Sequence, residues 1–281
     1  MKMGVDKLVW KIVLDIFIVL CVAAPWVGSM LGVEPYQRGY FPNDPSLSLP
    51  YKQETITELT LGFVGFAVVI ATVTVTEWVR DHHDKGTGEK FLGDVILPGW
   101  LWQSYTVVGV YTFGALAQQL VGEVTKKVIG RLRPNFFAVC QPVPVAVSPL
   151  NTLGYIQDFH CAGADAAMNK EVRLSFYSAH ASYAMFTAVF LIWYLQQRCS
   201  WHGSHLLRHG LQLAAFLAAW YAALSRVVDN MHHWGDVAAG VAAGALFGVV
   251  AFVFVLRLKV RKYRSSLPSQ WPPVTQTEMP R

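Results

Sequence analysis

The sequence predicts an all-α membrane protein, a six-transmembrane helical bundle with an extramembrane helical and loop insertion between spans three and four. The 281 residues are 53% hydrophobic and only 15% charged, whereas a soluble domain carries about 25% charged residues. Six apolar segments approach the length of about 20 residues that a membrane-spanning helix needs. The same composition, with 13% aromatic residues, excludes an intrinsically disordered chain.

The six predicted spans are separated by connections of very different length. The first span is too long for a secretory signal and lacks a clean cleavage site, so we interpret it as a retained anchor. The fourth is the shortest. The insertion, from Glu123 to Tyr177, is the longest connection. The predicted spans are Leu8 to Leu31, Leu59 to Val79, Leu101 to Val121, Ala181 to Gln196, Leu206 to Leu224 and Val237 to Leu256.

One domain is expected over residues 1–264, followed by a disordered cytosolic tail over residues 265–281 that has four prolines and no apolar periodicity. Basic residues near both ends place the two termini in the cytosol, as an even number of spans requires. Six cations of the insertion count against this orientation, but the rule weakens for long loops. These cations are Lys126, Lys127, Arg131, Arg133, Lys170 and Arg173.

The net charge of +5 does not indicate a nucleic-acid partner. Much of the excess lies beside the apolar segments, where attraction to the cytosolic membrane surface explains it. Four cysteines are too few for a disulfide scaffold. Cys140 and Cys161 both lie in the outer insertion, where a disulfide is permitted, and two free thiols are the alternative.

The first polar motif follows the third span. On a helix, Lys126 and Arg133 are two turns apart and share one face, and Pro134 ends that helix. A planar guanidinium and an ammonium on one face can bind a phosphate. An ordinary basic patch beside the membrane is the alternative.

The second motif, Ser178-Ala179-His180, begins the fourth span. Ser178 is suited to cap the helix, and backbone N–H groups at such an end favour an anion. His180 is placed to exchange protons with a bound group. The alternative is a capping serine followed by an interfacial histidine.

The third motif joins the fifth and sixth spans and ends at Asp236. On a helix, the Asp236 carboxylate can accept a proton from one ring nitrogen of His232, which leaves the other nitrogen free as a nucleophile. Asp229 and Asp236 are also within helical reach of His233, so spacing does not single out His232. A metal-binding or merely solvated turn is the alternative, although polar groups between spans are usually functional.

The predicted topology brings the three motifs together. With six spans and cytosolic ends, the loops after the third and fifth spans lie on the same, non-cytosolic side. For each motif alone, the non-catalytic alternative given above is an adequate explanation. The coincidence of all three motifs at one face of the bilayer instead favours a shared site.

In order and spacing, these motifs resemble the tripartite signature of the type 2 phosphatidic acid phosphatase superfamily. Lys126 is followed by six residues and Arg133-Pro134, Ser178 and His180 are one residue apart, and Ser225-Arg226 precedes the pair His232 and Asp236. Several short runs are most similar to the animal lipid phosphate phosphatases, and the likeness extends from about residue 15 to residue 255. These runs are Gly130–Pro134, Leu174–Ser178, Ser225–Val227, Pro35–Gly39 and Tyr51-Lys52.

The resemblance implies a core like that of acid phosphatases and vanadium haloperoxidases. It also implies hydrolysis of lipid phosphate monoesters without a metal ion or any other cofactor. By analogy, His232 forms a phosphohistidine, Asp236 orients it, and His180 protonates the departing alkoxide and then activates water. Substrate-binding residues hold the phosphoryl oxygens. They are Lys126, Arg133, Ser178, Ala179 and Arg226.

The family usually has glycine at the position of Ala179. A positive φ there costs alanine about 1–2 kcal/mol, and a negative φ costs nothing. We expect activity to be retained, and reduced if the position is strained.

The expected partners are lipid phosphates in the bilayer, namely phosphatidate, lysophosphatidate, ceramide 1-phosphate and sphingosine 1-phosphate, in phospholipid metabolism and lipid signalling. The plasma membrane is the expected location, with an extracellular or lumenal site. Phosphatases for sphingoid or sugar phosphates alone, a non-catalytic lipid-phosphate-binding relative and a transporter are the competing interpretations. Gly240, Gly244 and Gly248 form a small-residue face, which serves packing within the bundle or, alternatively, a homo-oligomer.

Overall fold

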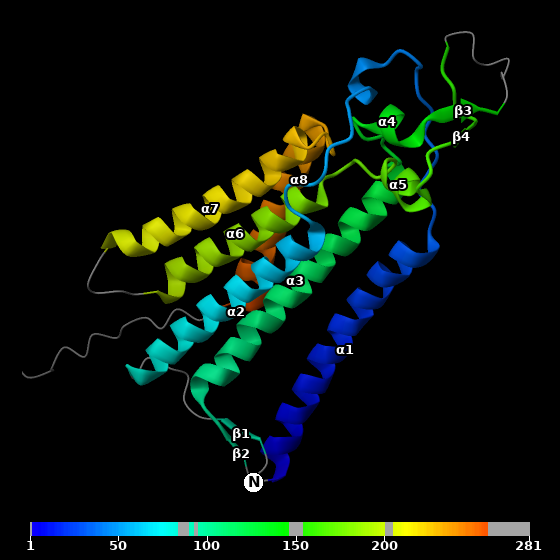
Figure 1. The fold of residues 1–281 in the computed structure, drawn as a ribbon. Coiled ribbons are helices and arrows are strands. Elements are labelled where there is room, and N and C mark those ends of the chain that lie inside the picture. The colour runs from blue at the N-terminus through cyan, green and yellow to red at the C-terminus, as the bar shows by residue number, and fades with distance from the viewer. Residues whose placement is uncertain (1, 84–89, 93–94, 146–153, 200–204, 258–281) are drawn as a thin grey trace, which may run out of the picture.

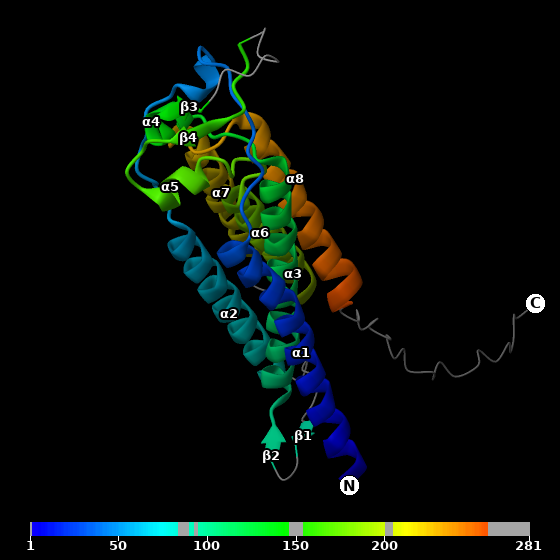
Figure 2. The same ribbon diagram turned by 90° about the vertical axis from the view of Figure 1, so that its right-hand side faces the viewer.

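The computed structural model describes residues 2–83, 90–92, 95–145, 154–199 and 205–257. Long helices run side by side, with a cap of short elements at one end of the bundle and the N-terminus at the other (Figure 1, Figure 2). The long helices are α1 (Lys2–Gly32), α2 (Glu58–His82), α3 (Gly99–Ile129), α6 (Ala179–Arg198), α7 (His205–Val228) and α8 (Trp234–Val250), which continues into a π-helical turn, η2 (Ala251–Leu256).

Each of the six predicted spans is helical, but only four helices in the described part of the chain are apolar and long enough to cross a membrane. The other two, α3 and α6, contain polar residues that neighbouring helices bury, such as Gln118 and Ser182. A helix shielded by its neighbours does not need an apolar surface all round, which explains why α3 and α6 are less apolar than the other four. The four are Leu8–Gly32, Glu58–His82, Leu206–Val228 and Trp234–Leu256.

Helix α3 ends differently from the prediction. It runs past the predicted Val121 to Ile129, and Gly130 then ends it in the left-handed conformation, with φ of +57°. A Cβ atom at Gly130 would lie 2.1 Å from the carbonyl oxygen of Tyr36, so only glycine fits. The prediction that a helix carries both Lys126 and Arg133 is therefore wrong, because the chain has left the helix before Arg133.

Helix α6 packs most extensively against α7 and α8. Ideal Cβ atoms at Gly240 and Gly244 of α8 would lie 2.5 and 2.1 Å from the carbonyl oxygens of Ser178 and Ser182 of α6. The small-residue face predicted on the sixth span is thus used inside the bundle, where it brings two backbones together. This contact places the start of α6 against the start of α8.

An aromatic core lies between α2, α3, α6 and η2. Its rings meet at tilted and edge-to-face angles, as in the pairs Phe66–Tyr111 and Phe190–Phe252. Such interdigitated packing fixes the helices relative to one another. The main buried members are Val69, Val73, Val107, Tyr111, Phe186, Phe190, Tyr194 and Phe252.

The cap is built mainly by the chain between α3 and α6. Cys140 and Cys161 form a disulfide with Cα atoms 4.6 Å apart, at the pairing of β3 and β4, where Pro142 lies opposite Cys161. A cluster around Tyr40 and Phe136 fills the interior. The cap elements are η1 (Pro45–Leu47), α4 (Phe136–Cys140), β3 (Pro142–Pro144), β4 (Phe159–Cys161) and α5 (Ala166–Glu171).

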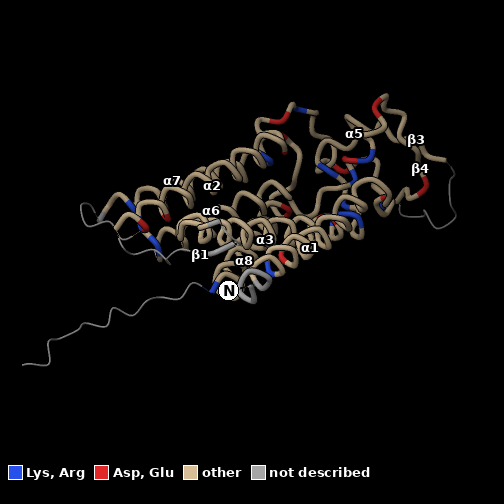
Figure 3. The backbone as a smooth tube through the Cα atoms, turned by 90° about the horizontal axis from the view of Figure 1, so that it is seen from below, with Lys and Arg blue, Asp and Glu red and all other residues tan. Residues whose placement is uncertain are grey.

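Charged residues gather mainly at the two ends of the bundle (Figure 3). At the end away from the cap, buried Glu77 receives a hydrogen bond from Tyr194 and pairs with Arg80 and Arg198 at 3.6 and 3.5 Å. A hairpin of β1 (Lys90–Leu92) and β2 (Val95–Leu97) lies at the same end. The predicted tail, residues 265–281, lies outside the described residues.

Candidate active site

The turn between α7 and α8 presents His232. Asn230 reverses the chain in this turn with a φ of +59°. The N–H groups of Met231 and His232 fix the turn by donating to the Arg226 carbonyl oxygen at 3.1 and 3.2 Å. The His232 side chain is buried, and its Nδ1 lies 2.7 Å from the carbonyl oxygen of Ser175. A carbonyl oxygen can only accept, so Nδ1 carries the proton and Nε2 is left with its lone pair.

The Asp236 carboxylate does not bind His232, contrary to the expectation from their spacing. Its Oδ1 accepts from Arg131 Nη1 at 2.6 Å, and its Oδ2 accepts from Ser175 Oγ at 2.5 Å and from the His233 N–H at 3.2 Å. The physical reason is that α8 begins only at Trp234. His232 therefore lies before the helix, where helical spacing does not apply.

The two neighbouring histidines have different surroundings. His233 is the N-cap residue of α8, and its Nε2 lies 3.1 Å from the carbonyl oxygen of Leu132. His232 instead faces the three cations described below. No group of three or more His, Cys, Asp or Glu side chains suited to a metal ion occurs within the described ranges.

Ser178 begins α6 as its N-cap and lies against α8. Its hydroxyl accepts from the N–H of Ala181 at 3.4 Å, and its own N–H donates to the Asp236 carbonyl oxygen at 3.1 Å. Ala179 follows in helical conformation, with no positive φ. The strain considered for alanine at this position is therefore absent.

His180 lies in the first turn of α6 and is also buried. Its Nδ1 is 3.8 Å from a carboxylate oxygen of Glu58, and its buried Nε2 has no hydrogen-bond partner. Native structures rarely leave a buried polar atom unpaired without a functional reason. The free Nε2 is suited to exchange a proton with a bound molecule.

Three buried cations, Lys126, Arg133 and Arg226, lie close enough to both His180 and His232 for their charges to act on the two imidazoles. Burial, and then these three positive charges, lower the pKa of His232 well below its ordinary 6.5. The imidazole is therefore neutral at pH 7, the form that a nucleophile requires.

The cations retain capacity to bind an anion. The Nε atoms of Arg133 and Arg226 are buried and make no hydrogen bond, and the Lys126 ammonium has no hydrogen bond or ion pair to any described residue. Arg226 pairs with Glu54 at 2.8 Å, and Arg133 with Glu171 at 3.4 Å. Cationic donors in a buried setting bind phosphate oxygens well.

The segment before α2 lies across the site and was not anticipated. Lys52 donates to the Val228 carbonyl oxygen at 2.9 Å, and Thr55 donates to the Asp229 carboxylate through both its N–H and its hydroxyl. No spacing or periodicity in the sequence marks Glu54 or Thr55. Ser175 and Arg131 lie inside the runs quoted above, but nothing there indicated their bonds to Asp236.

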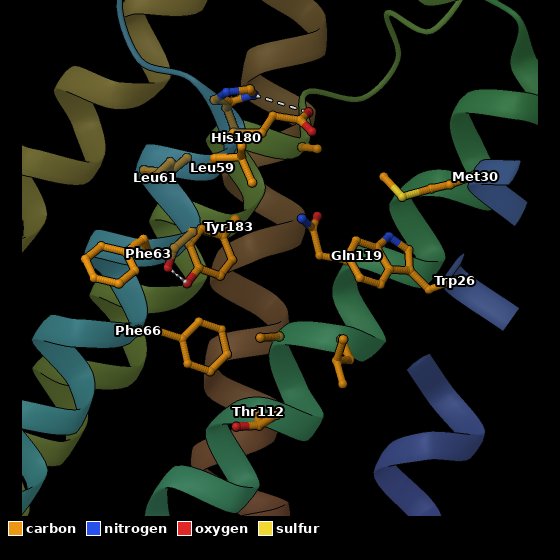
Figure 4. Close-up of a pocket in the computed structure, with 15 residues that line it drawn as sticks. Trp26, Met30, Leu59, Leu61, Phe63, Phe66, Thr112, Gln119, His180 and Tyr183 are labelled. Atoms are coloured by element: carbon orange, nitrogen blue, oxygen red, sulfur yellow. Dashed lines mark hydrogen bonds and ion pairs between the residues drawn. The ribbon is translucent and has the colours of Figure 1, made fainter. Parts of the chain in front are cut away.

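A cavity of about 520 Å³ leads from His180 into the bundle between α1, α2, α3 and α6. Figure 4 shows His180 at one end and mostly apolar side chains along the walls. The cavity extends to Thr112, well inside the apolar part of the bundle. Its labelled lining residues are Trp26, Met30, Leu59, Leu61, Phe63, Phe66, Thr112, Gln119, His180 and Tyr183.

Comparisons with known proteins find relatives along most of the chain. The chain is 38% identical over 262 residues to a Drosophila melanogaster protein provisionally named phosphatidate phosphatase, covering 89% of this chain and 69% of the relative. It is 34% identical to phospholipid phosphatase 1 of Mus musculus and 35% identical to phospholipid phosphatase 2 of Rattus norvegicus. Each match spans 244 residues, 87% of this chain and 84% or 85% of the relative.

No solved structure gives a significant match. The family match covers the part of the chain that carries the three motifs. The PAP2 superfamily model matches residues 107–259, a range that includes Lys126, Arg133, His180, His232 and Asp236. With these motifs in order and relatives matched along most of their length, the chain belongs to the PAP2 superfamily.

Proposed function

We propose that this protein hydrolyses lipid phosphate monoesters without a metal ion, through a phosphohistidine on His232. One observation carries the proposal. A neutral imidazole, with its proton held on Nδ1 and its Nε2 lone pair available, lies among three buried cations. This is the combination that an attack on a phosphate monoester needs, because the nucleophile must be uncharged and the phosphoryl oxygens must be neutralised.

The reaction divides into two displacements. In the first, Nε2 of His232 attacks phosphorus, the bond from phosphorus to the lipid oxygen breaks, and His180 gives its proton to the departing alkoxide. In the second, His180 takes a proton from water, whose oxygen attacks phosphorus as the bond to His232 breaks. The sum is one lipid alcohol and one inorganic phosphate for each water consumed.

The phosphoryl oxygens are assigned to the three cations and to the start of α6. Lys126, Arg133 and Arg226 supply positive charge on donors that are already in place, as transition-state stabilisation requires. The first N–H groups of α6, at Ala179 and His180, add the positive end of the helix dipole. Ser178, the N-cap residue, fixes the position of this helix end.

The cavity favours a lipid over a soluble substrate. It connects His180 with the apolar interior between α1, α2, α3 and α6. A lipid whose phosphate lies at His180 can place its chains along Trp26 and Phe66, where burial of each CH₂ contributes about 0.8 kcal/mol. We include phosphatidate, lysophosphatidate, ceramide 1-phosphate and sphingosine 1-phosphate among the substrates.

We propose six spans, with α3 and α6 crossing the bilayer as the shielded members of the bundle. The outer helices expose large apolar side chains, among them Phe17, Phe63, Leu206 and Leu246, as contact with lipid tails requires. The cap, which carries the disulfide, is assigned to the extracellular or lumenal side, where disulfides persist. Both termini are then cytosolic, and the plasma membrane is the proposed location.

The test is phosphate release from detergent-dispersed phosphatidate in the presence of EDTA. His232→Ala should lose activity by at least about a thousandfold, as loss of a nucleophile does in other enzymes. His209→Ala, at an exposed position on α7 far from the site, is the matched control and should keep the wild-type rate. Equal rates for wild type and His232→Ala would overturn the proposal, and so would loss of the wild-type rate in EDTA.

A further inference from the structure

We propose that Ser175 is a positioning residue for His232, and that Asp236 acts on the nucleophile through it. The inference rests on the proposed function, because it concerns the same imidazole. It assigns a role to a serine outside the three motifs, and it accounts for a carboxylate that lies near the nucleophile without binding it.

Every polar group of Ser175 is engaged, and the residue is completely buried. Its carbonyl oxygen accepts from Nδ1 of His232 at 2.7 Å, and its hydroxyl donates to Oδ2 of Asp236 at 2.5 Å. Its N–H donates to the carbonyl oxygen of Arg131 at 3.0 Å. A residue held at three points cannot rotate its peptide plane, so the acceptor for His232 has a fixed direction.

Asp236, which accepts the hydrogen bond from the Ser175 hydroxyl, is also firmly held. Arg131 binds Ser175 through its backbone and Asp236 through its guanidinium, which closes a ring of three residues. The Asp236 carboxylate, also fully buried, is further bonded by the N–H of His233, the residue next to the nucleophile. A buried carboxylate needs such full compensation, and a closed network of this kind is rigid.

The network determines which nitrogen of His232 can attack. The bond from Nδ1 to the Ser175 carbonyl fixes the tautomer and the ring orientation, so that Nε2 is the free nitrogen. The Ser175 hydroxyl bonds to Asp236 and makes no hydrogen bond to Lys126, Arg133 or Arg226, the residues that we assign to phosphate. Loss of this hydroxyl should therefore impair turnover and leave phosphate binding in place.

The main experiment compares Ser175→Ala with Ser182→Ala. Ser182 is an equally buried serine whose hydroxyl donates to the Gln118 side chain instead of Asp236. Ser175→Ala keeps the carbonyl bond to His232 and removes the hydroxyl bond to Asp236. We expect it to lower kcat on the order of 10- to 100-fold, the scale of effect when an outer-shell hydrogen bond behind a metal-ligating histidine is removed. The KM and the inhibition constant for inorganic phosphate should stay within about twofold, and Ser182→Ala should match wild type.

A double-mutant cycle with Asp236→Asn tests whether Ser175 influences turnover through Asp236. If Ser175 acts through Asp236, the loss of kcat in Ser175→Ala should largely disappear in the Asp236→Asn background, because coupled residues are not additive. Additive losses would overturn the inference. Ser175→Thr keeps the hydroxyl and should recover activity. If Ser175→Ala does not fold, Ser175→Cys, which replaces the hydroxyl by a weaker donor, carries the same comparison.

His232→Ala in the same assay separates the two proposals. If His232→Ala is inactive while Ser175→Ala keeps the kcat of Ser182→Ala, the positioning role is wrong and the proposed function stands. If His232→Ala is fully active, the proposed function falls and the positioning role falls with it. A rise in KM without a change in kcat would also contradict the positioning role, since it would mean that Ser175 serves substrate binding.

Discussion

The guanidinium of Arg226 is bound by the carboxylate of Glu54, with Nη2 and Oε1 2.8 Å apart. The same guanidinium donates from Nη1 to the Ile56 carbonyl oxygen at 3.3 Å. Glu54 belongs to the segment that precedes α2 and lies across the site, and Glu58 follows it beside His180. Arg226, which we assign to phosphate binding, is thus already paired with Glu54, and a phosphate must compete with this carboxylate for the guanidinium.

Glu54→Gln should therefore strengthen phosphate binding. Removal of the negative charge weakens the competing pair and reduces repulsion of the phosphate dianion. Because the Glu54 side chain is 26% exposed, we expect an effect of about 0.4–1 kcal/mol, or a two- to fivefold lower inhibition constant for inorganic phosphate. Inhibition of lipid phosphate hydrolysis by added phosphate measures this constant.

Glu34→Gln is the matched control for this change. Glu34 pairs with Lys170 and Arg173 on the cap and is largely exposed, so its loss should leave the inhibition constant unchanged. An inhibition constant that rises in Glu54→Gln would show the opposite role, in which Glu54 holds Arg226 in the geometry that phosphate needs.

The acid limb of the pH profile should depend on the cations around His232. Its pKa lies well below the ordinary 6.5 because of burial and then the charges of Arg133, Lys126 and Arg226. The neutral form therefore persists below pH 6.5, and kcat/KM should fall only when the pH drops to this lowered pKa. Arg133→Met removes one positive charge, so the pKa of His232 should rise and the acid limb should move to higher pH.

Profiles for wild type and Arg133→Met are measured with the same lipid phosphate, so that the ionisation of the substrate is common to both. Arg173→Met removes a cation that pairs with Glu34 on the cap and is not among the three charges that lower the pKa of His232. Its profile should coincide with that of wild type. An acid limb that stays in place in Arg133→Met would contradict the assignment of His232 as the group that must be neutral.

Ala179→Gly should give no gain in turnover. Ala179 occupies the first turn of α6 with a helical backbone, so glycine relieves no strain there. The kcat should remain within about twofold of wild type, and stability should fall by at most about 1 kcal/mol, the helical preference of alanine over glycine. A large increase in kcat would instead show that the alanine methyl group obstructs the phosphate.

The long apolar segments predict the helices well, because a run of about 20 apolar residues has few alternatives to a helix in a membrane. Helix ends are less predictable. The end of α3 depends on the left-handed conformation of Gly130 beneath the Tyr36 carbonyl oxygen, a contact between distant segments. The polar residues of α3 and α6, such as Gln118 and Ser182, bond to each other inside the bundle, and only the packing reveals that they are shielded.

The candidate site, like the fold, is predictable from the sequence only in part. The spacing of the motifs and their resemblance to a family predict which residues carry the chemistry, and the structure groups the cations with His180 and His232. The partners of these residues are not predictable from spacing. Asp236 binds Ser175 and Arg131 because α8 starts after His232, and Glu54 meets Arg226 across 172 residues of chain.

The cavity predicts a dependence on the length of the lipid chain. Thr112 lines it on α3, away from His180 (Figure 4), so Thr112→Trp should fill the inner part without reaching the catalytic groups. Rates for long-chain phosphatidate should fall about tenfold, within the 1–3 kcal/mol that a misfitted apolar group costs. Rates for a short, soluble phosphate monoester should change less than twofold, because its phosphate needs only the region of His180.

Val121→Trp is the control for a bulky residue on the same helix. Val121 lies on α3 outside the cavity and is 45% exposed, so tryptophan there should affect neither substrate. The ratio of the two rates, long-chain over short, isolates the effect of the cavity from any general loss of folding, since a folding defect lowers both rates equally. If Thr112→Trp lowers both rates by the same factor, the lipid chains do not occupy the inner part of this cavity, and they must leave the site along another path.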